Sequence, residues 1–491
     1  MRLETDCVPM KWPSGPLELA RRERKGPVSP ELRETLRAWH QPAALERLRG
    51  TAVDCLIVTW AAGLPQDEEQ QGSLKPLIER GRQTGIQFIG WVDEGADTTS
   101  AAVKARAAGL SAVVSESDAE NRSELPIIPI SSRPKARWDL PGRFLILNDA
   151  IWPQIRSNIE EGKDQVDAGP TGIPWVNSNG WYVRLAKALS SEKTIWLAVD
   201  PSKGSRSSYL VAMADARAFG AHWVISLDET LQAGIANGTP PALEAWRNIA
   251  ATAAFFKSHD DWTAYHPQGV LAVLSYFSGD NEFMSGEILN LLCRRHLPLH
   301  VVARSRATTS SFEGLKAILY ADQDSPTDGL RQDLLTFVQK GGLLIAPSNW
   351  KMTEGVPSPE NPQEGYQMRR LGSGRVALAK QEWQDPYEVA TEAHLMLSHS
   401  NDLVRLWNAG GTNSMYTASP DGSKSLVQIV NYSVGGQNDS ISLWLKQPYR
   451  SARFSSLSAN EPVSLQKVTE FGEAELHLPA FPVYGAVELE K

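Results

Sequence analysis

The sequence predicts an α/β protein in which a (β/α)8 TIM barrel is followed by a flavodoxin-like domain and a small antiparallel β-sandwich. Three observations support this fold class. Apolar runs alternate with helix-like segments in the first half, the same pattern continues in a shorter middle part, and a two-residue alternation fills the last part. At about 150 residues per domain, 491 residues suggest roughly three domains. We place them at 1–262, 263–398 and 399–491.

The first part contains eight short apolar runs separated by amphipathic segments. Continuous apolar strands that alternate with helices are typical of a parallel sheet covered on both faces, and eight of them favour a closed barrel. The predicted strands are VDCLIVTW (53–60), IQFIGWV (86–92), LSAVVS (110–115), PIIPIS (126–131), RFLILND (143–149), IPWVNSN (173–179), TIWLAVD (194–200) and HWVISLD (222–228).

The middle part repeats this alternation with fewer strands, which predicts a doubly wound sheet. Its predicted strands are GVLAVLSYFS (269–278), LPLHVVARS (297–305), GLKAILYAD (314–322) and GGLLIAPSN (341–349). Beyond about residue 400, short alternating segments such as SLVQIVNYS, SISLWLKQ and VYGAVELE are bounded by Gly, Asn, Asp and Pro. This pattern is typical of an antiparallel sandwich.

Composition excludes several classes of partner. Lys and Arg number 49 against 57 Asp and Glu, so 49 − 57 gives a net charge of −8, and we expect no nucleic-acid partner. No run of about 18 apolar residues occurs, so we expect no membrane span. The first residues, MRLETDCVPMKW, lack the apolar region of a signal peptide. The compartment stays open between cytoplasm and a mature secreted or periplasmic chain.

Tryptophan is the unusual residue type, because its count of 16 exceeds those of Phe and Tyr. Indole N–H groups need hydrogen-bond partners, so an excess of Trp favours a binding cleft, and sugar rings are ligands that suit flat aromatic platforms. The three cysteines, Cys7, Cys55 and Cys293, are too few for a disulfide framework and too scattered for a zinc site.

The domain order, with phrases such as LLTFVQKGGLLIAP, LGSGRVALAK and HLPAFPVYGAVELE, resembles the layout of glycoside hydrolase family 42 beta-galactosidases and related barrel glycosidases. The resemblance implies a hydrolase that acts on an oligo- or polysaccharide. It also implies a middle domain similar to a class I glutamine amidotransferase that has lost its nucleophile and serves in homo-oligomerisation. An active glutaminase needs a Cys on a tight strand-to-helix turn, whereas Cys293 lies in the helix-like segment LNLLCRRH.

Barrel enzymes carry their chemistry at the C-terminal ends of the strands, and glycoside hydrolysis needs two carboxylates there. Asp149, Asp200 and Asp228 lie at the C-terminal ends of predicted strands. The Asn148-Asp149 pair is similar to the Asn-Glu motif of the related glycosidases, with Asp in place of Glu. We expect Asp149 to be the general acid/base, Asp228 the nucleophile or second base, and Asp200 a substrate or electrostatic group. The structural alternative is that these acids cap the following helices.

Aromatic and amide side chains near the same strand ends suit a sugar, because they offer apolar contact to ring faces and hydrogen bonds to ring edges. An acid of the middle domain, in the segment SGDNEFMSGE, is added to this set, although a capped helix start is its alternative interpretation. The predicted substrate-binding residues are Trp60, Trp91, Asp93, Asn148, Trp152, Asn177, Asn179, Trp181 and Glu282.

Two other functions stay open. The chain is a carbohydrate-binding protein on a degenerate barrel if its acids are engaged in caps or salt bridges. The other alternative is a purely structural three-domain protein whose middle domain mediates assembly. We expect no cofactor. We also expect no metal, because His222 and His399 have no ligand-spaced partner in the sequence.

Overall fold

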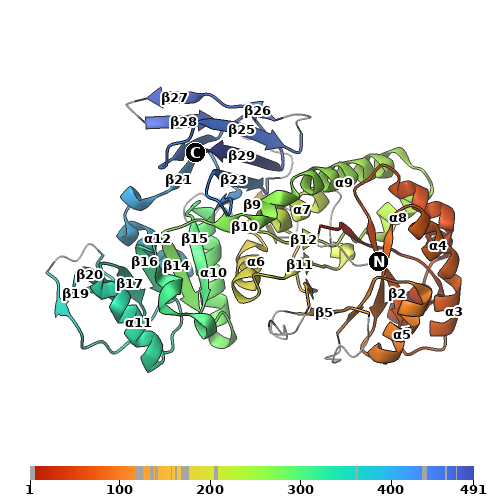
Figure 1. Ribbon diagram of the computed structural model, residues 1–491, viewed down its shortest axis with the longest axis horizontal. Helices are drawn as coiled ribbons and strands as arrows, with labels where there is room; N and C mark the ends of the chain where they lie inside the picture. The colour runs from red at the N-terminus through yellow and green to blue at the C-terminus, as the bar shows by residue number, and fades with distance from the viewer. Residues whose placement is uncertain are drawn as a thin grey trace. The chain divides into compact units, whose positions relative to one another are not determined.

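The computed structural model of the chain describes residues 6–116, 125–132, 138, 142–155, 157–160, 163–166, 176–203, 208–359, 363–433, 440–458, 462–470 and 473–491. Contacts divide the chain into two units (Figure 1). The first unit is Met1–Trp152 with Glu192–Asp260, and the second is Pro153–Ser191 with Asp261–Lys491. In the part of the chain given above, no helix is long and apolar enough to cross a membrane.

The first unit is built on eight parallel strands that form a nearly closed barrel, which confirms the barrel predicted from the sequence. In barrel order they are β1 (Pro9–Lys11), β2 (Cys55–Ala61), β3 (Gln87–Val92), β4 (Ala112–Ser115), β5 (Ile127–Ser131), β6 (Phe144–Leu147), β11 (Thr194–Leu197) and β12 (His222–Trp223). A parallel bridge between Met10 and Ile225 joins the first strand to the chain just after the last. Lys11 N donates to Ile225 O at 2.9 Å, and Ile225 N donates to Pro9 O at 2.9 Å.

One predicted barrel strand is wrong and one true strand was missed. In the predicted strand 173–179, Val176–Asn177 form β10, which pairs antiparallel with β7 (Gln154–Ile155) in the second unit. The eighth barrel strand is β1, which pairs parallel with β2. Asp200 and Asp228 follow the neighbouring strands β11 and β12, in the order that the sequence predicts.

Alternate side chains of the strands fill the barrel interior, because successive residues of a strand point to opposite faces. Cys55 and Ile57 of β2 point inward with Ile89 of β3 and Trp196 of β11, and they share one buried cluster. Residues of the opposite parity point outward, toward the helices. Each fully buried Ile, Val or Phe side chain stabilises the fold by about 1.5–3 kcal/mol.

Helices surround the barrel, and several start at residues that cap them. Ser29 accepts from Leu32 N before α2, and Asp97 accepts from Thr99 N before α5, which ends at Gly109 with a left-handed φ of 83°. The helices of this unit are α1 (Pro16–Lys25), α2 (Pro30–His40), α3 (Asp67–Ser73), α4 (Lys75–Gln83), α5 (Thr98–Ala108), α7 (Ser208–Ala218), α8 (Glu229–Ala236) and α9 (Pro240–Ser258).

The second unit contains a seven-stranded sheet in the order β15-β14-β16-β17-β20-β19-β18, of which the first five strands are parallel. That order is the 2-1-3-4-5 order of a doubly wound sheet. Its strands are β14 (Leu271–Ser275), β15 (Leu299–Ala303), β16 (Ala317–Tyr320), β17 (Leu343–Ala346), β18 (Val356–Pro357), β19 (Tyr366–Leu371) and β20 (Gly374–Ala379). Its helices are α6 (Gly180–Leu189), α10 (Glu282–Arg294), α11 (Asp328–Gln339) and α12 (Pro386–Leu397). The amidotransferase-like assignment of this part stays a prediction.

Two antiparallel sheets complete this unit, and side chains from both share one buried cluster around Val427, Leu443 and Val487. One sheet comprises β13 (His266–Pro267), β22 (Thr412–Ala418), β23 (Lys424–Asn431), β29 (Tyr484–Glu490), β25 (Ser451–Ser456) and β26 (Val463–Ser464). The other comprises β21 (Val404–Trp407), β24 (Ser442–Leu445), β28 (Glu473–His477) and β27 (Lys467–Glu470). A short hairpin, β8 (Ser157–Glu160) and β9 (Lys163–Val166), is separate from them.

A buried histidine connects the end of α10 to β22. His296 is 8% exposed, and its Nδ1 lies 3.0 Å from Ser414 Oγ. Burial lowers the pKa of His296 to about 4, against a smaller opposing effect of the Ala409 carbonyl. The folded chain therefore holds this imidazole neutral at pH values where the unfolded chain protonates it.

We expect acid to destabilise the second unit through His296. Between pH 6.5 and about 4 the unfolded state binds the proton and the folded state does not, so stability is lost as pH falls through this window. The full loss is about 3 kcal/mol. Urea midpoints measured from pH 7 to pH 4 check this. His296→Asn, which tolerates the left-handed φ of 55°, should flatten the dependence, whereas His266→Gln at an exposed position should not.

Candidate functional site

A cavity of about 710 Å³ opens at the C-terminal ends of the barrel strands, where barrel enzymes carry their chemistry. It lies entirely within the first unit. Four cationic and four anionic side chains line it, so the site is highly charged and nearly balanced. They are Lys11, Arg21, Arg22, Lys25, Glu18, Asp200, Asp228 and Glu229, and the lining also includes Asn148, Trp91, Ser202, Ser226, Thr230 and Gln232.

One wall of the cavity is an ionic network on α1. Glu18 is 7% exposed, and its carboxylate accepts from Arg22 Nε at 3.0 Å, Arg21 Nη1 at 3.2 Å and Thr59 Oγ1 at 2.7 Å. Arg21 also makes a two-pronged pair with Asp93. Burial raises the pKa of the Glu18 carboxyl, but the charges of Lys11, Arg21 and Arg22 lower it more, and the net pKa lies below its usual range.

Lys11 and Trp91 stand side by side next to this network. The Lys11 Nζ lies 5.1 Å from the centroid of the Trp91 ring, and Trp91 Nε1 donates to Asp93 Oδ1 at 3.0 Å. Burial lowers the pKa of the Lys11 amine, and Glu18 opposes this effect. An indole face and a cation at one mouth suit a ligand that has both apolar and polar groups.

Asp228 combines a helix cap with a place in the cavity lining. Its Oδ1 accepts from Leu231 N at 2.8 Å at the start of α8, and its Oδ2 lies 3.3 Å from Tyr209 Oη. Burial, followed by the charge of Asp228, raises the pKa of Tyr209, so this hydroxyl stays protonated.

Asp200 lies at the end of the neighbouring strand β11. Its side chain is exposed to the cavity, and its Oδ1 accepts from Ser202 N at 3.0 Å. The Asp200 carbonyl accepts from Trp152 Nε1 at 3.0 Å. Trp152 is 7% exposed and packs on Tyr209 and Trp223, so its indole holds the Asp200 backbone from the buried side.

The structure brings some predicted site residues together and separates others. Asn148, Trp91, Asp200 and Asp228 line the cavity, and Asp93 is bound to Arg21 beside it. Asp149, half-buried after β6, is outside the lining. Trp60 is 1% exposed and donates to Ala101 O at 3.0 Å, so it packs between the barrel and α5. Asn177, Asn179, Trp181 and Glu282 belong to the second unit.

Sequence reasoning missed the whole contribution of α1 to the cavity. The sequence contains a pattern that indicates this ionic network. The run LELARRERK places Glu18 three and four residues before Arg21 and Arg22, on one helix face. Lys11 was missed together with its strand.

Comparison with solved structures shows the same overall fold in a glycosidase. Alpha-L-fucosidase isoenzyme 2 from Paenibacillus thiaminolyticus matches with a TM-score of 0.58 at 10% identity, over 94% of this chain and 96% of that chain. A beta-galactosidase from Rahnella sp. R3 matches with a TM-score of 0.41 at 11% identity, over 86% of this chain and 66% of that one. A rhamnosidase from Novosphingobium sp. PP1Y matches with a TM-score of 0.42 at 11% identity, over 86% and 38%.

No protein-family model matches the sequence, and no curated protein matches it. At these identities the likeness concerns the fold alone. The expected resemblance to barrel glycosidases is thus confirmed as a resemblance of fold, since the chain has the fold of solved glycoside hydrolases.

We expect Glu18→Gln to destabilise the first unit by about 3 kcal/mol, because it leaves Lys11, Arg21 and Arg22 close together without their buried counter-charge. Glu23→Gln on the same helix is the matched control. It breaks only the exposed pair with Arg33, worth about 1 kcal/mol or less. Urea unfolding followed by Trp fluorescence measures both losses. Equal losses would contradict a structural role for the buried network.

Proposed function

We propose that the chain is a glycoside hydrolase that binds an oligo- or polysaccharide in the barrel cavity and uses Asp200 and Asp228 as its carboxylate pair. The observation that carries the proposal is that these two acids, at the ends of adjacent strands, line one cavity of about 710 Å³. Parallel barrel strands end at one rim, so acids that follow adjacent strands can face the same bound sugar, as glycoside hydrolysis requires.

The surroundings of the two acids suggest different roles. Asp228 accepts a backbone N–H bond that fixes its carboxylate at the start of α8, and a fixed carboxylate suits a nucleophile or base. Asp200 is the more exposed acid and suits proton transfer to and from the leaving group or water. It takes the acid/base role that the sequence analysis gave to Asp149, because Asp149 is outside the lining.

Substrate contacts follow from the rest of the lining. Trp91 offers an aromatic surface for a sugar ring, while Asn148 and Lys11 offer hydrogen-bond donors to hydroxyl groups. Trp152 acts as a positioning residue, since it holds the Asp200 backbone and does not line the cavity.

A second candidate function, carbohydrate binding without turnover, is favoured by one specific observation. Every acid that lines the cavity has a structural partner: Glu18 and Glu229 pair with arginines, and Asp200 and Asp228 accept backbone N–H bonds. A hydrolase needs carboxylates that contact the substrate as well as their structural partners. A protein that only binds sugar does not need a reactive carboxylate, so it is compatible with acids that serve as caps and ion pairs.

A hydrolysis screen on aryl glycosides and polysaccharides, with Asp200→Asn and Asp228→Asn beside the wild type, tests the proposal. Asn is also a good N-cap, so both variants should keep their folds while they lose the ionisable group. We expect kcat to fall at least about 100-fold in each. The matched control is Glu244→Gln, at an exposed position on α9, which should keep wild-type activity.

Activity that survives in both Asn variants would contradict the pair. A wild-type chain that hydrolyses none of the panel, yet binds glycans as tightly as Asp228→Asn does, would establish the binding function instead. Affinity measured on immobilised glycans separates these two cases.

A further inference from the structure

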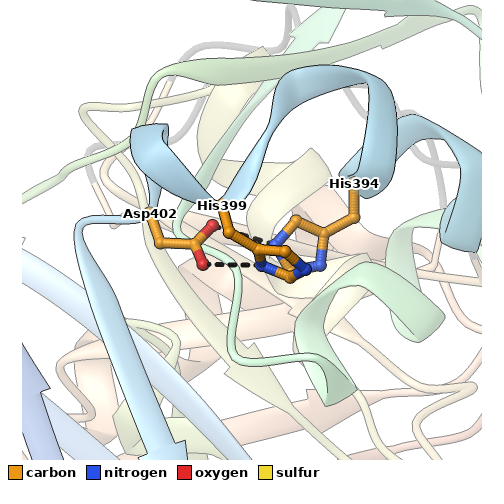
Figure 2. Close-up of side chains that lie close together, drawn as sticks. All are labelled: His394, His399 and Asp402. Carbon is orange, nitrogen blue, oxygen red and sulfur yellow. Dashed lines mark hydrogen bonds and ion pairs between the residues drawn. The ribbon is translucent and has the colours of Figure 1, made fainter. Parts of the chain in front are cut away.

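The turn between α12 and β21 brings two imidazoles and a carboxylate together. His394 lies in the last turn of α12, His399 begins a short 3-10 turn, and Asp402 follows that turn just before β21 (Figure 2). All three belong to the second unit. His399 has no ligand-spaced partner along the sequence, but in the fold it contacts Asp402 and His394, because the turn folds back on the end of the helix.

The carboxylate of Asp402 contacts both rings at once. Its Oδ1 lies 2.9 Å from His394 Nε2, and its Oδ2 lies 3.0 Å from His399 Nδ1 (Figure 2). One possible ligand atom from each residue falls within 4.8 Å of the other two. Two ligands at about 2.1 Å from one zinc ion lie about 3–3.4 Å apart, so only a small displacement brings the three atoms onto one ion.

The residue that has to move is the one that is free to do so. The His399 side chain is 60% exposed, whereas His394 and Asp402 are 10% and 4% exposed. The buried pair therefore forms a fixed half of a site, and the exposed ring covers its open side.

One neighbouring cation opposes metal binding. Arg405 Nε donates to Asp402 Oδ2 at 3.1 Å, and its Nη2 donates to the His399 carbonyl at 2.7 Å. The guanidinium also lies 4.7 Å from the Trp444 ring centroid. It shares the carboxylate with any bound ion, which lowers the affinity.

We propose that His394, His399 and Asp402 bind one divalent transition-metal ion, with zinc as the representative. Two imidazoles and one carboxylate are a ligand set that suits zinc and its neighbours, whereas magnesium and calcium prefer oxygen alone. Three protein ligands leave the fourth position of a tetrahedral ion to water. The bound ion ties the end of α12 to the start of β21 and so stabilises the connection between the doubly wound sheet and the antiparallel sheets.

Calorimetric titration of the full chain, prepared without an affinity tag, with zinc chloride tests this site. We expect one equivalent to bind and to raise the midpoint of thermal unfolding, while magnesium chloride does neither. In His399→Ala, whose exposed side chain can be removed without opening the core, affinity should fall at least about 100-fold. The matched control His266→Gln removes an exposed histidine elsewhere in the same unit and should bind as the wild type does.

A second variant tests the place of the ion. Arg405→Gln removes the competing positive charge beside Asp402 and should bind zinc several-fold more tightly. Affinity that is unchanged or weaker in this variant would contradict Asp402 as a ligand. Zinc binding by the wild type that is no tighter than binding by His399→Ala would overturn the proposal and leave a His–Asp–His hydrogen-bond network. None of these readouts depends on glycosidase activity.

Discussion

The fold of the first unit depends on how the barrel is closed. Strand β1 is only three residues long, yet it pairs with β2 on one side and bonds to Ile225 after β12 on the other. Without it, two strands would present unpaired N–H and C=O groups at open edges. Asp54 holds the segment in place, since it accepts from Val8 N at 2.8 Å and from Lys257 Nζ at 2.7 Å. The same strand delivers Lys11 to the mouth, and the chain then turns into α1, which supplies Glu18 and Arg21.

The charged residues at the mouth of the barrel both stabilise the fold and line the cavity. The buried Glu18 carboxylate neutralises cations that would otherwise repel one another. Arg21, which pairs with Glu18, also forms an ion pair with Asp93. Asp200 and Asp228 line the same cavity, where each accepts a backbone N–H bond at the start of a short helix. A carboxylate has about four acceptor sites, so capping a helix and contacting a ligand are compatible.

Much of the fold follows from sequence patterns, and the exceptions have physical reasons. Long continuous apolar runs identified seven barrel strands and four of the five parallel strands of the second unit, because burial on both faces requires such runs; β20 was missed. Strand β1 was missed because three residues that include a proline carry no periodic signal. Run 173–179 was misassigned because an apolar run does not reveal its pairing partner.

The same distinction applies to the candidate site. Asp200 and Asp228, which were expected at strand ends, line one cavity, since parallel strands end at one rim, and their chemical roles stay predictions. Trp60 was predicted to bind substrate, but it points away from the barrel interior. The inward residues of β2 are the odd-numbered Cys55 and Ile57, so the even-numbered Trp60 points outward. His394, His399 and Asp402 meet only because a turn reverses the chain after α12, which spacing along a sequence does not show.

The path of the backbone between the two units sets a limit on how this protein can be divided. Residues 153–191 leave the barrel after β6 and return before β11, so the chain passes from one unit to the other three times. Leu185 and the neighbouring Trp181 pack in the core of the second unit. A gene fragment that ends after α9 would therefore carry an apolar helix without its partner. The barrel is one structural unit made from two separate segments of the chain, so a single recombination point cannot transfer it complete to another protein.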